Sequence, residues 1–174
     1  MKLFGPLSRT LALAGLFSVA LFSAPAMAAK ADVELLQSYI GQWKGRGQLV
    51  GAESETVVCR LTLSPGNQDK VNYAGRCSMA GTALSVNGTL AYNDGARRYE
   101  AAMTSNATFN GLAVGKKSGN GVVFNLKERA ADEEGRDMTI TAQIALNSGK
   151  ISVQFNVVFN ATGDMLKASV PFTK

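Results

Sequence analysis

The sequence predicts an all-β protein, an antiparallel meander β-barrel of nine or ten strands with one short N-terminal helix near its mouth. The first observation is that apolar and polar residues alternate from about residue 57 onward, the period of strands with one buried face. The second is that short polar segments rich in Gly, Asn and Asp separate these runs, as hairpins require. Closing into a barrel removes the exposed edges of so long a sheet. A two-sheet β-sandwich is the alternative, because it produces the same alternation.

The N-terminal segment has the three parts of a secretory signal peptide. Lys2 and Arg9 supply the positive charge, residues 11–22 form an apolar run, and Ala26-Met27-Ala28 is a small-x-small cleavage site. A retained membrane anchor is the alternative, but the run is shorter than the roughly 20 apolar residues that span a bilayer. We therefore expect a signal peptide over 1–28, one barrel domain over 29–174, no stable membrane span after cleavage, and a periplasmic or secreted bacterial protein.

The charge of the chain follows partly from this leader. The formal net charge of +5 falls to +3 when Lys2 and Arg9 are removed, since the leader contains no acidic residue. The remaining Lys and Arg are scattered along the sequence, and the chain has only four Tyr and one Trp. A nucleic-acid partner is therefore not expected.

One helix precedes the expected strands. Asp32 is placed to cap a helix over Val33 to Ile40, in which Val33, Leu36 and Ile40 share one side. Gly41 would end it, and the first strand follows.

The expected strands each have one apolar face. In chain order, these faces consist of Val57, Cys59, Leu61 and Leu63; Val71, Tyr73, Cys77 and Met79; Leu84, Val86, Leu90 and Tyr92; Met138, Ile140, Ala142, Ile144 and Leu146; Ile151, Val153, Phe155, Val157 and Phe159; and Leu166, Ala168, Val170 and Phe172. The segment from Thr104 to Gly111 breaks the alternation. Its large apolar residue, Phe109, belongs either to a lid over a ligand or to a long connection anchored in the core.

The two cysteines predict a disulfide. If the hairpin folds about Gln68, residues whose numbers sum to 136 lie opposite each other, and Cys59 and Cys77 meet this condition. Opposed residues of antiparallel strands approach closely enough for a disulfide, which an oxidising compartment allows to form. A redox or metal-binding pair is the alternative, but the sequence has neither a C-x-x-C motif nor additional soft ligands around them.

The same register places Arg60 opposite Arg76 on the reverse face. Two opposed cations repel unless an anion lies between them, either an acidic side chain or the carboxylate or phosphate of a ligand. The alternative is two solvated arginines on the outer wall. A similar choice applies to Arg97, which shares a face with Tyr99 and either forms an anion-capturing pair with it or sits in water beside the Asn93-Asp94-Gly95 turn. The candidate ligand-binding residues are thus Arg60, Arg76, Arg97, Tyr99 and Phe109.

The segment Gly41-Gln42-Trp43-Lys44-Gly45-Arg46-Gly47 carries a family resemblance. Its G-x-W resembles the opening of the calycin superfamily, which includes the lipocalins and fatty-acid-binding proteins, and the longer G-x-W-x-G-x-G resembles nitrobindin-like barrels. The resemblance implies that Trp43 plugs a closed end, that Gly45 and Gly47 let the first strand bend and pack closely, and that a cavity holds a small molecule. Nitrobindin-like proteins hold haem through a histidine, and this chain has none, which excludes haem binding by that route. A Tyr or Met haem ligand is the alternative, and we expect no cofactor.

The missing histidine also argues against an enzyme. Serine and cysteine nucleophiles lose their usual base, and zinc loses its commonest nitrogen ligand. The acidic cluster from Glu128 to Asp137 is expected in a solvated hairpin turn, with no metal site. The leading hypothesis is a periplasmic lipocalin-like protein that binds a small lipophilic or carboxylate-bearing ligand. The alternative is an envelope protein that acts through a protein partner, such as a protease inhibitor or cell-envelope integrity factor.

Overall fold

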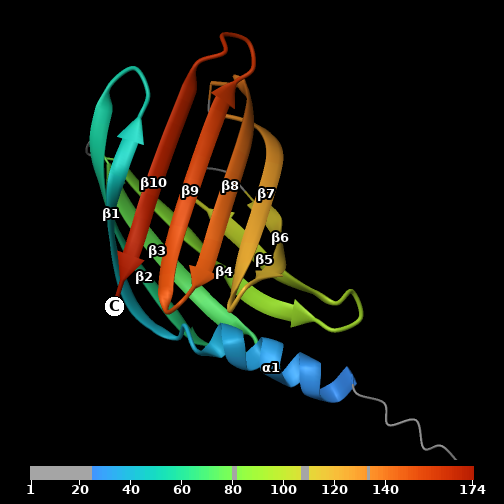
Figure 1. Ribbon diagram of the computed structural model, residues 1–174. Helices are drawn as coiled ribbons and strands as arrows, with labels where there is room; N and C mark the ends of the chain where they lie inside the picture. Colours follow the sequence, from blue (N-terminus) through green and yellow to red (C-terminus); the bar gives the residue numbers. More distant parts are fainter. Residues whose placement is uncertain (1–24, 80–81, 107–109, 133) are drawn as a thin grey trace, which may run out of the picture.

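The chain folds into a closed barrel of ten antiparallel strands preceded by one helix (Figure 1). The computed structural model describes residues 25–79, 82–106, 110–132 and 134–174. Each strand pairs with its neighbours in sequence, and β10 returns to pair with β1. The predicted meander barrel is therefore confirmed, and the sandwich alternative is wrong. The elements are α1 (Pro25–Gln37), β1 (Gly41–Val50), β2 (Ser54–Pro65), β3 (Val71–Met79), β4 (Thr82–Asn93), β5 (Arg98–Ser105), β6 (Asn110–Ser118), β7 (Gly121–Ala131), β8 (Asp137–Asn147), β9 (Lys150–Phe159) and β10 (Met165–Thr173).

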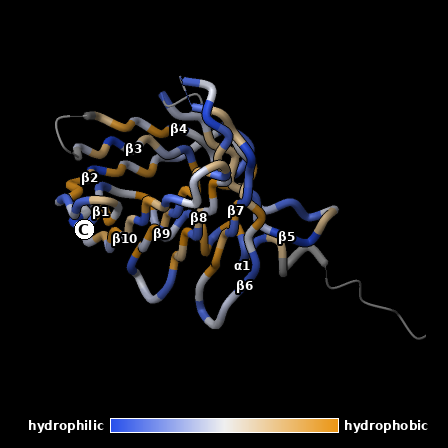
Figure 2. The backbone as a smooth tube through the Cα atoms, turned by 90° about the horizontal axis from the view of Figure 1, so that it is seen from above, coloured by the Kyte–Doolittle hydropathy of each residue, from blue (hydrophilic) through white to orange (hydrophobic). Residues whose placement is uncertain are grey.

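The alternating apolar residues point into the barrel. Every predicted inward residue lies in the buried cluster or against the interior cavity, except Met79, whose side chain lies outside the described residues. Figure 2 shows the same alternation as hydrophobic and hydrophilic segments that follow one another along the strands. The interior is thus built by the period-two pattern.

Helix α1 is longer and earlier than predicted. It begins at Pro25 and ends at Gln37, so Asp32 lies within the helix and does not cap it. The reason is the Ala-rich segment before Asp32, because Ala has the highest helix propensity, and Pro is favoured at the first helical position. Of the expected leader, residues 1–28, the first 24 residues lie outside the described part of the chain. Its last four residues form the first turn of α1.

The mid-chain segment is also more regular than expected. Thr104 and Ser105 end β5, while Asn110 and Gly111 begin β6, so the connection is shorter than the predicted loop. Phe109 lies outside the described residues.

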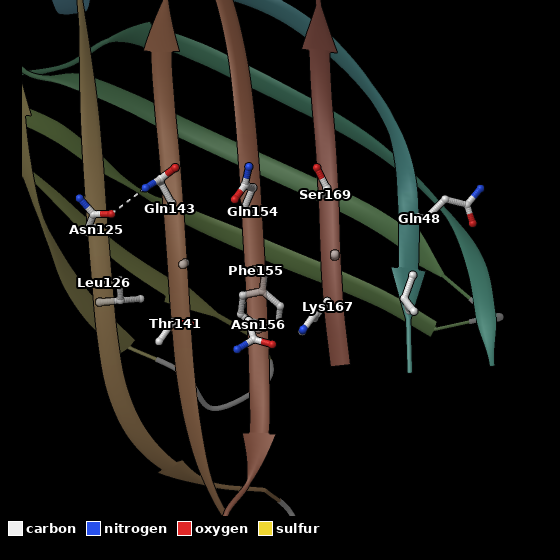
Figure 3. Close-up of a pocket in the computed structure, with 13 residues that line it drawn as sticks. Gln48, Asn125, Leu126, Thr141, Gln143, Gln154, Phe155, Asn156, Lys167 and Ser169 are labelled. Carbon is white, nitrogen blue, oxygen red and sulfur yellow. Dashed lines mark hydrogen bonds between the residues drawn. The ribbon is translucent and has the colours of Figure 1, made fainter. Parts of the chain in front are cut away.

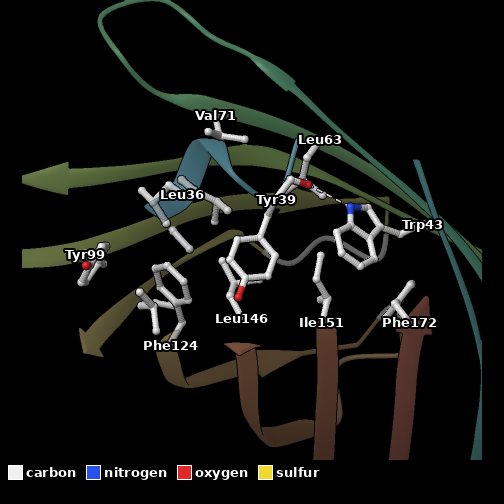
Figure 4. Packing of buried hydrophobic residues seen from close by; sticks show 14 of the residues in the cluster. Leu36, Tyr39, Trp43, Leu63, Val71, Tyr99, Phe124, Leu146, Ile151 and Phe172 are labelled. Atoms are coloured by element: carbon white, nitrogen blue, oxygen red, sulfur yellow. Dashed lines mark hydrogen bonds between the residues drawn. The ribbon is translucent and has the colours of Figure 1, made fainter. Parts of the chain in front are cut away.

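Helix α1 lies across one end of the barrel, where β1 begins and β10 ends (Figure 1). Leu36 and Tyr39 are buried there. The Tyr39 ring stacks on that of Trp43, whose indole Nε1 donates a hydrogen bond to the carbonyl oxygen of Tyr39 at 2.9 Å. The buried residues of this end, drawn in Figure 4, include Leu63, Val71, Tyr99, Phe124, Leu146, Ile151 and Phe172. This end is therefore closed by packed side chains, and the helix covers it rather than the mouth that we expected.

The opposite end is looser because β6 and β7 part from each other. Their pairing runs from Ser118↔Gly121 only as far as Val114↔Asn125. Within the described residues, β6 remains paired with β5 back to Asn110, and β7 remains paired with β8 as far as Ala131. The two strands thus present unpaired edges to each other near the open end.

Candidate ligand-binding cavity

The barrel encloses an apolar cavity of about 540 Å³. The closed-end cluster forms its floor, where Leu63, Leu146 and Phe172 line it. Alternate residues of β2, β4, β8, β9 and β10 form the wall of the cavity. Toward the open end the lining residues stand near the starts or ends of strands, namely Leu84, Met138, Phe159 and Leu166. A cavity of this size is within the range of small-molecule sites.

The predicted disulfide is confirmed and lies in the cavity wall. Cys59 of β2 and Cys77 of β3 are directly opposed, bonded through their sulfurs, with their Cα atoms 4.0 Å apart. Both residues line the cavity. The bond therefore fixes the pairing of two strands that form one side of the interior.

Arg60 and Arg76 are directly opposed, as the same register predicts. Although Arg60 adjoins the cavity between Cys59 and Leu61, both arginine side chains are exposed. The alternation that turns Cys59 and Cys77 inward must turn their neighbours outward. The outer-wall alternative, two solvated arginines, fits the exposure of both side chains.

Two further predicted ligand residues, Arg97 and Tyr99, do not line the cavity. Arg97 is exposed in the turn between β4 and β5, where its φ is +49°. Tyr99 is buried in the closed-end cluster, outside the cavity lining. The alternative in which Arg97 sits in water beside the turn fits this exposure, while Tyr99 lies on the buried face of β5.

Tyr99 instead anchors helix α1. Its hydroxyl donates a hydrogen bond to Asp32 Oδ1 at 2.6 Å, and Lys117 Nζ lies 3.2 Å from the same oxygen. Burial alone would raise the pKa of Asp32, but the Tyr99 and Lys117 hydrogen bonds and the Lys117 charge hold it below its ordinary value. Burial, and then the Asp32 carboxylate, raise the pKa of Tyr99. No local pattern in the sequence predicts this pair, because 67 residues separate its members.

Few polar groups adjoin the cavity. Burial raises the pKa of Tyr73, whose hydroxyl donates to the carbonyl oxygen of Ala102 at 3.0 Å. Asn106, near the end of β5, donates to the carbonyl oxygen of Ala83 and accepts from the backbone nitrogen of Ser85. Asp132 accepts a hydrogen bond from Arg136 at 2.6 Å. These groups already have protein partners, so the lining presents mainly apolar surface to a ligand.

Asn106 and Asp132 were missed as cavity residues. Both lie where a strand ends, and neither belongs to an alternating run from which its orientation could be inferred. Asp132 lies in the turn after β7, where its carboxylate accepts a hydrogen bond from Arg136 Nε. The Arg136 guanidinium lies 5.1 Å from the centre of the Phe159 ring. The acidic cluster therefore closes a hairpin beside the open end.

A second, shallow depression lies on the outer wall. A row of polar side chains crosses it from β7 to β1, namely Asn125, Gln143, Gln154, Ser169 and Gln48, as Figure 3 shows. Gln143 Nε2 donates to Asn125 Oδ1 at 3.0 Å.

Among the described residues, no group of three or more His, Cys, Asp or Glu side chains is arranged to hold a metal ion. No helix in the described ranges is long and apolar enough to cross a membrane.

Comparisons with known proteins support the class of fold. No protein-family model matches the chain, and the curated proteins contain no match. Among solved structures, Rv2717c from M. tuberculosis aligns with a TM-score of 0.61 at 12% identity, over 82% of this chain and 97% of that one. The S-type phycobiliprotein lyase CPES from Guillardia theta aligns with a TM-score of 0.52 at 10% identity, over 80% and 89% of the two chains.

A redesigned β-barrel, mFAP0, bound to DFHBI, gives a TM-score of 0.40 at 11% identity, over 77% of this chain and 98% of that one. That score is too low to support any inference. The first two alignments establish a shared barrel fold. At these identities they establish nothing about ligand or activity.

Proposed function

We propose that this protein is an exported, periplasmic, non-catalytic binding protein that holds a small lipophilic or amphipathic molecule inside its barrel. The observation that supports this function is the apolar cavity of about 540 Å³, closed at one end by the cluster beneath α1. An apolar ligand would gain about 25 cal/mol for each Å² of surface that it removes from water there.

The cavity lining also restricts the ligand's polar part. The side chains of Arg60, Arg76 and Arg97 are exposed, which favours solvated guanidinium groups over groups buried with a ligand. Burying an unpaired charge in an apolar site is costly. The ligand is therefore expected to be neutral where it lies in the cavity, with any polar group at the open end, near Asn106 and Asp132.

Filling the cavity tests this function directly. Ala142 lines the cavity, whereas Ala74 is exposed on the outer face of β3. Ala142→Phe should abolish binding of the neutral fluorescent probe N-phenyl-1-naphthylamine because the new ring occupies its volume. Ala74→Phe, the same change on the outer wall, should leave binding intact. Titration by probe fluorescence measures both, with circular dichroism to confirm folding.

Two results would count against the cavity. One is a wild-type protein that neither binds the probe nor gains thermal stability from it, since a ligand selective for the native state must raise the melting temperature. The other is equal probe binding by the Ala142→Phe and wild-type proteins. The exported state has its own measurement: protein recovered from a periplasmic fraction should have the intact mass of a chain beginning at Ala29, less two hydrogens for the disulfide.

A further inference from the structure

The outer wall formed by β10, β1, β2 and β3 is basic, and no acidic side chain points outward from it among the described residues. The exposed cations on these four strands are Lys167, Lys44, Arg46, Arg60 and Arg76. Glu55, the acidic residue of these strands, is opposite Leu49 on the inward-facing alternation of β2. We call this outer wall the basic face.

Three of these cations stand in one cross-strand row. Lys44 is opposite Arg60, and Arg60 is opposite Arg76. Like charges directly opposite each other destabilise a sheet. Within the described part of the chain, the ion pairs involve Lys30, Arg98, Lys117, Arg129 and Arg136 and none of the basic-face cations. The row therefore keeps its charge available for an external anion.

Exposed apolar side chains lie among these cations. Val58 is opposite Arg46 and two residues from Arg60, with 45% of its surface exposed. Val50 is opposite Lys167 at the end of β1, and Met165 begins β10 two residues before Lys167; they are 48% and 47% exposed. Of the large hydrophobic residues exposed in the described ranges, only Leu112 lies on another wall. The basic face thus combines positive charge with apolar side chains.

We infer that the basic face docks on a membrane surface containing anionic phospholipids. Lysine and arginine near such a surface are attracted by its negative potential, and apolar side chains among them insert at the headgroup boundary. A wholly acidic soluble partner would match the charge but would leave Val58, Val50 and Met165 unexplained.

The location of the apolar residues connects docking with the cavity. Val50 ends β1 and Met165 begins β10 at the open end, and the adjacent Leu166 lines the cavity. This consequence rests on the proposed function: docking would bring the opening near the membrane, so that a lipophilic ligand could pass between bilayer and cavity with little exposure to water.

Vesicle sedimentation tests the inference without reference to the cavity. Wild-type protein should sediment with vesicles of phosphatidylglycerol and phosphatidylcholine in equal parts, remain in solution with phosphatidylcholine alone, and be released by added salt. The double variant Arg60→Gln/Arg76→Gln should bind the anionic vesicles about 25-fold more weakly, at roughly fivefold for each cation. Val58→Ser alone should also weaken vesicle binding, because it removes an apolar contact with the membrane.

The matched control removes two cations elsewhere. Lys127 and Lys150 are exposed on β7 and β9, so Lys127→Gln/Lys150→Gln changes the net charge equally but should bind vesicles as the wild type does. Equal loss in both double variants, unchanged binding by Val58→Ser, or release of the protein by soluble polyglutamate as readily as by salt would overturn the inference. Probe binding without vesicle binding would leave the proposed function intact and refute docking. Vesicle binding without probe binding would support docking and refute the proposed function.

Discussion

At the scale of single residues, Asp32 is the polar link between helix and barrel. It is only 8% exposed, and its carboxylate accepts from Tyr99 of β5 and pairs with Lys117 of β6. Asp32→Ala would leave the buried Tyr99 hydroxyl without its acceptor, at a cost of about 1–3 kcal/mol in the free energy of unfolding. Denaturant unfolding measures this loss.

The charge of Asp32 should also make stability depend on pH. Because its pKa in the folded protein lies below the ordinary value of 3.8, its charged form stabilises the fold above that value, and the contribution is lost as pH falls through the lowered pKa. The stability difference between wild type and Asp32→Asn should thus be largest near neutral pH and shrink below pH 3.8. Asp164→Asn, in the exposed turn before β10, is the control. A difference that stays constant into acid would show that the charge of Asp32 does not contribute.

The residue-scale predictions succeeded where local pattern was sufficient. Cys59 and Cys77 could be paired from their distances to one turn, because a hairpin fixes its own register. The same register put Arg60 opposite Arg76, but whether that face lined the interior depended on how the whole sheet closed. Alternation put Tyr99 on one face with Arg97 but could not identify its partner Asp32, which comes from a distant helix.

At the scale of elements, β1 lies close to β10 because of glycines. A Cβ on Gly47 would clash with the backbone carbonyl of Ser169, and one on Gly45 would lie 2.7 Å from side-chain atoms of Phe172 and Val170. This contact fits the close packing that the G-x-W-x-G-x-G resemblance implies. The positions of β2, β3, β4, β8, β9 and β10 followed from alternation. The start of α1 did not, because its early turn contains Ala rather than a periodic apolar face.

Substituting Gly47 tests the close approach of these two strands. Gly47→Ala should reduce the free energy of unfolding by about 1–3 kcal/mol, since β10 must move to admit the methyl group. Gly95→Ala is the control, because its nearest neighbour, Asn93 Oδ1, would lie at an ordinary 3.6 Å. Thermal and denaturant unfolding measure both variants. Equal stability of the two would mean that β1 and β10 are not held at this separation.

At the scale of the whole molecule, the barrel is divided into a packed half and an open half. The packed half lies under α1 and contains the largest fully buried side chains, among them Trp43, Phe124 and Leu146. The open half surrounds the cavity mouth, where β6 and β7 have parted. A binding barrel needs this division, because the closed end holds the fold while the other end admits a ligand.

Hydrogen exchange should reveal this division along a single strand. Within β7, amides from Val122 to Asn125 lie where both neighbouring strands pair with it, whereas Leu126 to Ala131 pair with β8 alone. In the second group, amides that point toward β6 have no β6 partner to bond. They should therefore exchange with solvent orders of magnitude faster than the amides of the first group. If a ligand seals the barrel, adding the probe should slow exchange selectively in this second group. Uniform protection along β7, with or without probe, would instead describe a barrel closed along its whole length, whose cavity can be reached only through its end.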